Sequence, residues 1–201
     1  MTNTVKWLLI HGTDYSYRAL YDQRTACEGW HKDRDFPISS LGSQIGYHHL
    51  FTGGKAYRCK ADTDQGAHCN TVVNGISLNF QSLGYAVGFD GDIELMPAIE
   101  YGLLQRQVWA DQDKYGIPNN RVLFHRDFTS TSAGNKKTCP GSLITNAWLN
   151  TFLTRPSAVI PPLKAEENTC IAQEKEIVHL KEVVTWYETL VQKFYNIFSK
   201  R

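Results

Sequence analysis

Short hydrophobic runs that stop at a histidine are the feature that most limits how this chain can fold. Leu8–Ile10 leads into His11, and Val122–Phe124 leads into His125. An apolar run of this length is typical of a buried strand, whose last side chain then emerges at the edge of the sheet. The sequence therefore predicts two histidines at comparable strand ends.

A cysteine joins these histidines as a third candidate ligand. Cys139 follows a loop rich in glycine, serine and threonine, within the run Lys137–Gly141. Two imidazoles and a thiolate suit zinc, and three protein ligands leave a fourth tetrahedral position for water, as in catalytic sites. The ammonium of Lys137 would favour the ionised cysteine. We predict a hydrolytic zinc site formed by His11, His125 and Cys139.

Strand-like and helix-like segments alternate along the first three quarters of the chain. Strands are predicted at Val5–Ile10, Tyr47–Phe51, Ala56–Cys59, Asn74–Gln81 and Arg121–Phe124. Helices are predicted at Tyr17–Arg34, Ile99–Tyr115 and Leu143–Leu153. Gly116 and Pro118 should end the second helix, and Thr52–Lys55 should form a tight turn between two strands. This alternation predicts an α/β domain.

The pattern changes after residue 154. We predict a catalytic domain at 1–154, a proline-rich linker at 155–164 and an amphipathic helix at 165–201. The apolar positions of that helix follow a heptad spacing with an added third column, formed by Ile177, Leu180, Val184, Tyr187, Val191, Phe194 and Phe198 with Val183, Leu190 and Ile197. A face this broad favours a homo-oligomer through the C-terminal helix; the alternative is a helix that folds back on its own domain.

Charge and composition exclude several classes of partner. Lys+Arg 21 against Asp+Glu 20 leaves a net charge of +1, so we expect no nucleic-acid partner. No stretch approaches the ~20 apolar residues of a membrane span, and we expect no stable membrane insertion. The first residues lack the pattern of a secretory signal, which predicts a protein made in a cytoplasm. The five scattered cysteines predict no disulfide framework.

Eight segments together resemble the zinc-dependent N-acetylmuramoyl-L-alanine amidases, a family shared by T7-type phage lysozyme, bacterial recycling amidases and animal peptidoglycan recognition proteins. They cover about residues 5–153 in the family's order: Ile10–Thr13, Gly29–Lys32, Ile45–His48, Gly53–Tyr57, Gln65–His68, Gly75–Leu78, Val122–Asp127 and Lys137–Gly141. The resemblance implies an α/β fold with a central mixed β-sheet flanked by helices. It also implies a peptidoglycan substrate, cleaved at the amide between N-acetylmuramic acid and L-alanine.

The same resemblance assigns roles to individual residues. His11, His125 and Cys139 would bind Zn²⁺, Tyr47 would be the catalytic phenol, and Lys137 would stabilise the oxyanion. His68 resembles a position that lines the substrate groove, while a structural role satisfied by the backbone is an equal alternative. We expect structural roles for His31 and His49, a partner of a metal ligand in His48, and a core position for Trp30. The chain departs from the family in a longer loop at Thr129–Asn135 and in an extension at Leu41–Gln44.

Three biological settings fit such an amidase without a signal. We favour a phage endolysin, made in the host cytoplasm and released to the cell wall through a holin-type pore, because the Trp-His and Gly-Tyr-His segments resemble the T7-type proteins. The alternatives are a cytoplasmic muropeptide-recycling amidase and an effector injected into a competitor. A non-catalytic peptidoglycan-binding module also stays open, although Cys139 argues against it.

Overall fold

The computed structural model describes residues 3–128 and 138–155, which belong to one structural unit ending at Arg155. The predicted linker beyond Arg155, the C-terminal helix, the loop at 129–135 and Lys137 lie outside the described residues. No helix within the described ranges is both long and apolar enough to cross a membrane.

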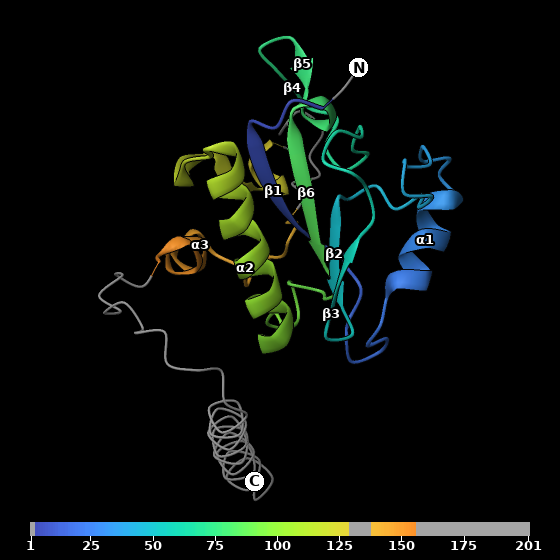
Figure 1. Ribbon diagram of the computed structural model, residues 1–201. Helices are drawn as coiled ribbons and strands as arrows, with labels where there is room; N and C mark the ends of the chain where they lie inside the picture. The colour runs from blue at the N-terminus through green and yellow to red at the C-terminus, as the bar shows by residue number, and fades with distance from the viewer. Residues whose placement is uncertain (1–2, 129–137, 156–201) are drawn as a thin grey trace, which may run out of the picture. The chain divides into compact units, whose positions relative to one another are not determined.

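A mixed five-stranded sheet forms the centre of the domain (Figure 1). Its strand order is β3-β2-β6-β1-β7, and only β3 runs antiparallel to its neighbour. The strands are β1 (Trp7–Gly12), β2 (His49–Thr52), β3 (Lys55–Arg58), β6 (Ser82–Val87) and β7 (Val122–Phe124). A small hairpin of β4 (Val72–Val73) and β5 (Ile76–Ser77) projects beyond the sheet. The predicted α/β fold class with a mixed sheet is confirmed.

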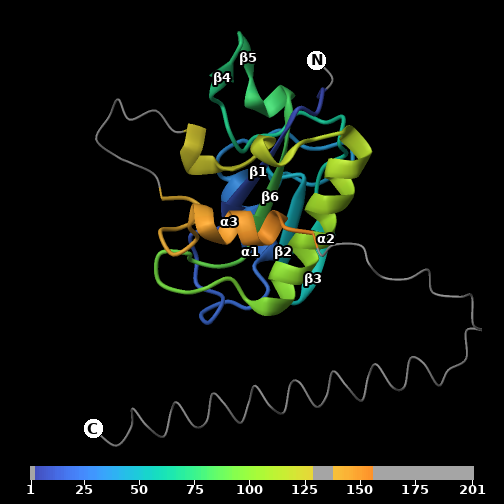
Figure 2. The same cartoon turned by 90° about the vertical axis from the view of Figure 1, so that its left-hand side faces the viewer.

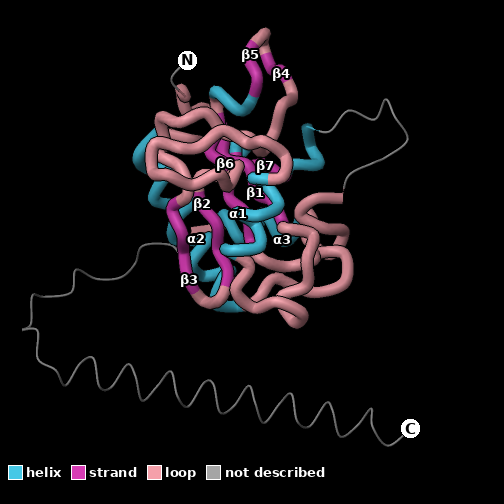
Figure 3. The backbone as a smooth tube through the Cα atoms, turned by 90° about the vertical axis from the view of Figure 1, so that its right-hand side faces the viewer, coloured by secondary structure: helices cyan, strands magenta, loops and turns pink. Residues whose placement is uncertain are grey.

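Helices cover the two faces of the sheet unequally. Two helices, α2 (Ala98–Tyr115) and α3 (Asn146–Leu153), lie over one face (Figure 2). They enclose the main apolar core with alternate strand residues, among them Leu8, Ile10 and Tyr85. The other face is covered by the short helix α1 (Arg24–Lys32) and by long loops (Figure 3).

Alternation along the strands decides which side chains reach the loop-covered face. In β1, Leu8 and Ile10 belong to the core under α2, so Leu9 and His11 point the other way. In β6, the residues on that second face are Ser82, Gly84 and Ala86, all small. This face therefore has room for polar side chains from the loops.

Two local predictions are confirmed by backbone geometry. Gly53 and Gly54 have φ values of 62° and 70° in the turn between β2 and β3, the left-handed region that a two-residue hairpin of this kind requires. Gly116 ends α2 with φ 64°, and its backbone N–H bonds to the carbonyl of Gln112.

The strand predicted at Asn74–Gln81 is wrong over most of its length, because only Ile76–Ser77 forms a strand (β5), and the central strand β6 was not predicted. Leu78–Phe80 forms a 3₁₀ turn, which Ser77 caps by accepting a hydrogen bond from the backbone of Asn79. Strand β5 therefore ends at Ser77, where this turn begins. The real strand alternates small with large residues and lacks the uniform apolar run expected of a buried strand.

The helix predicted at Tyr17–Arg34 is half as long as expected, since α1 begins only at Arg24. Gln23 is held by distant groups: its backbone N–H bonds to Thr52 Oγ1 at 3.0 Å, and its side-chain amide bonds to the carbonyl of Tyr15 at 2.8 Å. The backbone N–H of Tyr17 bonds to Glu94 at 2.8 Å. These tertiary bonds replace the helical ones over the first half of the segment.

Candidate metal centre

Adjacent parallel strands bring the two predicted histidine ligands together. β1 and β7 pair so that Ile10 lies opposite Phe124, and the next residue on each strand is a candidate ligand. The rings of His11 and His125 lie with centroids 4.6 Å apart. His11 is part of β1, one residue further inside the strand than predicted, whereas His125 begins a 3₁₀ turn, His125–Phe128.

Arg126 holds the cysteine segment against this strand end. Its backbone N–H donates to the carbonyl of Cys139 at 3.0 Å. Its guanidinium donates to the carbonyls of Thr138 at 3.1 Å and Gly141 at 2.8 Å, and also bonds to that of Ile144. Arg126 therefore fixes the chain on both sides of Cys139. The sequence motifs did not predict this role.

Close backbone packing fixes the same segment from the other side. A Cβ at Gly12 would lie 2.9 Å from the carbonyl oxygen of Pro140, and one at Gly91 would lie 2.1 Å from it. Next to Gly91, Asp92 accepts hydrogen bonds from Thr138 Oγ1 at 2.6 Å and from the backbone of Ser142 at 2.7 Å. Only glycines permit this approach, so Cys139 reaches the histidines because of residues far from it in sequence.

The geometry of the donor set fits a metal ion such as zinc. One donor atom from each of His11, His125 and Cys139 lies within 4.8 Å of the other two, and His11 Nδ1 is 3.8 Å from Cys139 Sγ. Tetrahedral zinc with bonds of about 2.0–2.3 Å separates its ligand atoms by about 3.3–3.7 Å. Small side-chain adjustments reach that spacing, and the mixture of imidazole and thiolate suits zinc.

A cavity of about 630 Å³ surrounds the donors and is large enough for a ligand. Tyr15, Trp30 and Arg34 line it together with the candidate ligands. Trp30, predicted as core, is half-buried, and its ring contacts that of Tyr15 at 5.5 Å between centroids. Tyr15 and Arg34 lie outside the eight sequence segments that resemble the family, and they reach the cavity only through the tertiary fold.

Tyr47 lies beside the donors, as a catalytic phenol would. Its ring centroid is 5.1 Å from that of His11, and the side chain is half-buried in the cavity wall. Burial, with a further contribution from Cys139, raises the pKa of the phenol above its usual range. The hydroxyl is therefore protonated near neutral pH and able to donate a hydrogen bond.

The remaining histidines have distinct surroundings. His68 is 8% exposed, and its Nδ1 lies 3.2 Å from His11 Nε2, while its ring also lines the cavity. His48 accepts a hydrogen bond from the backbone of Gly84 and contacts the ring of His68. His31 accepts one from the backbone of Gly46, and burial lowers its pKa to about 4. Substrate binding by His68 stays a prediction.

An α/β fold whose cavity holds two histidines and a cysteine with metal-ligand spacing is typical of zinc hydrolases. The sequence matches the N-acetylmuramoyl-L-alanine amidase family over residues 1–142. The chain belongs to this family, as the sequence motifs predicted. No functionally curated protein matches it by sequence.

Solved structures share the fold at low sequence identity. The amidase LysC from Clostridium intestinale URNW is 19% identical, with a TM-score of 0.56 over 74% of this chain and 85% of that chain. The endolysine amidase LysCS from Clostridium intestinale URNW is 21% identical, with a TM-score of 0.52 over 69% and 76%. The Ph2119 endolysin from Thermus scotoductus MAT2119 bacteriophage Ph2119 is 18% identical, with a TM-score of 0.53 over 77% and 88%.

Proposed function

We propose that this protein uses zinc, bound by His11, His125 and Cys139, to hydrolyse the amide between the lactyl group of N-acetylmuramic acid and L-alanine in peptidoglycan. The observation that carries the proposal is the convergence of these three donors in a ligand-sized cavity of a chain that belongs to the amidase family. Zinc in this position supplies Lewis-acid polarisation of a carbonyl and lowers the pKa of water.

The side chains around the donors would handle charge and protons. Hydrolysis adds water across the amide: the carbonyl carbon gains the hydroxyl, the C–N bond breaks, and the nitrogen of L-alanine takes the proton. Tyr47, whose ring lies beside that of His11, would donate a hydrogen bond to the developing oxyanion and relay that proton. Lys137 would be a second donor, on the strength of its position two residues before Cys139.

The cavity rim supports a glycopeptide substrate. Trp30 and Tyr15 offer aromatic surfaces to a sugar or a peptide, and Arg34 offers a cation to a carboxylate of the stem peptide. These contacts would hold the substrate in the cavity beside the candidate ligands.

Product analysis on purified cell walls tests the reaction. With zinc present, hydrolysis should release new amino termini of L-alanine and no new reducing sugar ends, because an amide and not a glycoside is cleaved. Cys139→Ser should bind zinc weakly and release nothing, whereas Cys59→Ser, which replaces a buried cysteine that does not line the cavity, should match the wild type. New reducing ends would overturn the proposal, and zinc-independent binding without cleavage would identify a binding module.

We further propose that the protein is a phage endolysin that reaches the cell wall from the host cytoplasm through a holin-type pore. The proposal is supported by the sequence motifs and by the endolysins among proteins of the same fold. Expression in a bacterial host should cause lysis only when a pore-forming holin is co-expressed. A recycling amidase would instead cleave soluble muropeptides faster than intact cell walls, and this result would overturn the endolysin role.

A further inference from the structure

A third histidine lies directly behind the candidate ligand His11. His68 Nδ1 is 3.2 Å from His11 Nε2, the ring nitrogen opposite the one that faces Cys139. The two rings meet edge to face, at 85° with centroids 5.1 Å apart, and both side chains are buried. One nitrogen of His11 thus faces the metal donors, and the other faces His68.

The direction of the hydrogen bond between the two rings follows from a serine on β6. Ser82 Oγ is 2.6 Å from the carbonyl oxygen of Leu78, which can only accept, so the single hydroxyl proton of Ser82 is directed there. Ser82 Oγ is also 3.5 Å from His68 Nε2 and must accept from it. His68 therefore carries its proton on Nε2, and its Nδ1 has a free lone pair.

The position of the proton on His68 decides which nitrogen of His11 carries a proton. Because His68 Nδ1 accepts, His11 Nε2 must donate, so the lone pair of His11 lies on Nδ1. That atom is the one 3.8 Å from Cys139 Sγ. The chain of bonds from the Leu78 carbonyl to His11 therefore presents the correct lone pair to a metal.

The surroundings of His68 leave its ring little room to shift. A Cβ at Gly66 would come within 2.5 Å of His68 Cδ2, and a Cβ at Gly84 within 2.6 Å of the same atom. The ring is thus held between two stretches of backbone that only glycine allows. Asn79 Oδ1 accepts from the backbone N–H of His68 at 2.9 Å and fixes the segment that carries it.

We propose that Ser82 and His68, held between Gly66 and Gly84, form a relay that fixes the tautomer of His11 for metal binding through Nδ1. The proposal rests on the proposed zinc function and makes His68 a positioning residue for a ligand. Ligating histidines usually donate to a carboxylate or a carbonyl. A neutral imidazole as acceptor adds no negative charge, so a centre with one thiolate keeps its positive charge for an oxyanion.

Histidine tautomers are directly visible by long-range ¹H–¹⁵N spectroscopy of protein labelled at histidine nitrogen. In both metal-free and zinc-loaded protein near pH 7.5, His11 and His68 should each carry a proton on Nε2 only. Assignments come from loss of the signals in single variants. A proton on Nδ1 of either ring in the zinc-loaded protein overturns the relay.

Zinc affinity, measured by competition with a chromophoric chelator, gives an independent readout. His68→Leu should weaken zinc binding about 10- to 100-fold, the usual effect of removing the partner of a ligating histidine. His68→Asn keeps an acceptor oxygen near the place of Nδ1 and should recover most of the affinity. Ser82→Ala should cause a smaller loss, because it only frees the His68 tautomer. His49→Phe, which replaces a buried histidine on the opposite face of the sheet, should bind zinc like the wild type.

The outcomes separate this proposal from the proposed reaction. Wild-type zinc affinity in a folded His68→Leu variant overturns the relay, and a raised KM at saturating zinc in that variant would mark a substrate-binding role instead. If His68→Leu fails to fold, Ser82→Ala and the spectra of the wild type still decide. Normal zinc binding without hydrolysis would remove the proposed reaction and leave the relay standing.

Discussion

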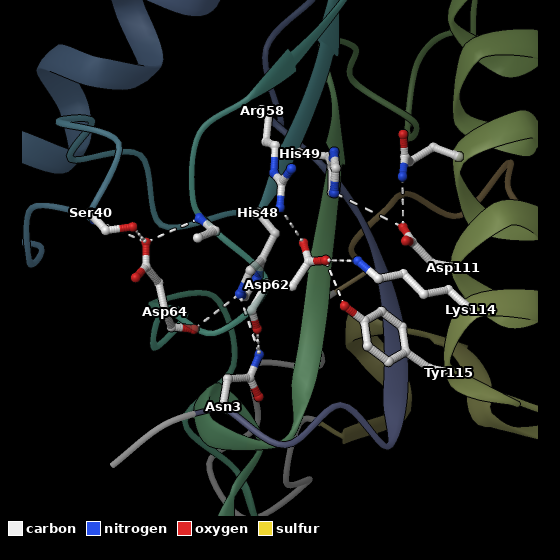
Figure 4. A network of polar contacts seen from close by, with 12 residues as sticks. Asn3, Ser40, His48, His49, Arg58, Asp62, Asp64, Asp111, Lys114 and Tyr115 are labelled. Atoms are coloured by element: carbon white, nitrogen blue, oxygen red, sulfur yellow. Dashed lines mark hydrogen bonds and ion pairs between the residues drawn. The ribbon is translucent and has the colours of Figure 1, made fainter.

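Polar side chains gather in two regions of this domain, one around the cavity and one near the surface around Asp62, and they are used differently. Around the cavity, His11, His125 and Cys139 direct their donor atoms toward one another. Between β3 and α2, by contrast, Asp62 accepts from Arg58 at 3.2 Å, Lys114 at 2.6 Å and Tyr115 at 2.6 Å (Figure 4). The first arrangement suits a cation from outside the chain, and the second satisfies a carboxylate within it.

The pKa shifts of Asp62 and Tyr47 agree with this contrast between the two regions. Burial raises the pKa of Asp62, but hydrogen bonds from Lys114 and Tyr115 outweigh it and leave the pKa below its usual range. Burial also raises the pKa of Tyr47, with a further contribution from Cys139. Substitutions in the network should therefore change stability, whereas substitutions in the cavity should change zinc binding or rate.

The largest expected effect is that of Tyr47→Phe on activity. Loss of the phenol should reduce kcat about 10²- to 10⁴-fold, the range for a general acid or base, because the oxyanion and the leaving amine lose a donor. Zinc affinity and the unfolding midpoint should stay near the wild type. Tyr57→Phe, which removes a hydroxyl bonded to Asp22 outside the cavity, is the control. Equal activity in the two variants would exclude Tyr47 from the chemistry.

Arg126→Ala should affect both zinc binding and stability, because Arg126 holds the segment that carries Cys139 and is not among the residues that line the cavity. Loss of its bonds to the Thr138, Gly141 and Ile144 carbonyls should cost at least about 1.5 kcal/mol of unfolding free energy. Zinc affinity should fall about tenfold as Cys139 becomes less constrained. The matched control is Arg155→Ala, since Arg155 also bonds to a carbonyl, that of Trp109. Unchanged zinc affinity in Arg126→Ala would show that close backbone packing alone fixes the cysteine.

The free energy of unfolding should depend on pH through the buried histidines His48 and His49. Burial lowers the pKa of His48 and of His49 to about 4, against about 6.5 in an unfolded chain. The unfolded state therefore binds protons first as the pH falls, so stability is complete above about pH 6.5 and declines toward pH 4. Each histidine contributes a slope of up to about 1.4 kcal/mol per pH unit. His49→Phe should flatten the profile measured by denaturant unfolding, and an unchanged slope would mean that His49 does not titrate this way.

The smallest effect should come from Asp62→Asn in the network. The amide keeps its place but loses the charge that binds Lys114 and Arg58, which should cost about 1 kcal/mol at pH 7 because both partners are largely exposed. Since the native pKa is lowered, this stabilisation is present above the unfolded value of about 3.9 and disappears as the pH falls through the native value. Zinc affinity and kcat should not change; a loss of either would mean that the two regions are coupled.

Prediction from sequence succeeded where short-range patterns carry the information. The candidate ligand set of His11, His125 and Cys139, the two-glycine turn and the bounds of α2 each follow from a few neighbouring residues. It failed for β6 and for the start of α1, where distant partners decide the outcome: Gln23 bonds to Thr52, and the small residues of β6 face loop side chains. The roles of Tyr47, His68 and Lys137 came from the resemblance, and all three remain predictions.

The sequence by itself determined the chemistry available to this protein, because ligand identity and strand-end position are local properties. Only the tertiary structure decided how those groups are prepared. Arg126, Gly12 and Gly91 bring Cys139 to the histidines, and Ser82 and His68 orient His11. These contacts join residues that are far apart along the chain. The direction of each hydrogen bond also depends on whether the donor's proton already goes to another acceptor, as the hydroxyl proton of Ser82 goes to the Leu78 carbonyl. Such constraints exist only once the chain is folded.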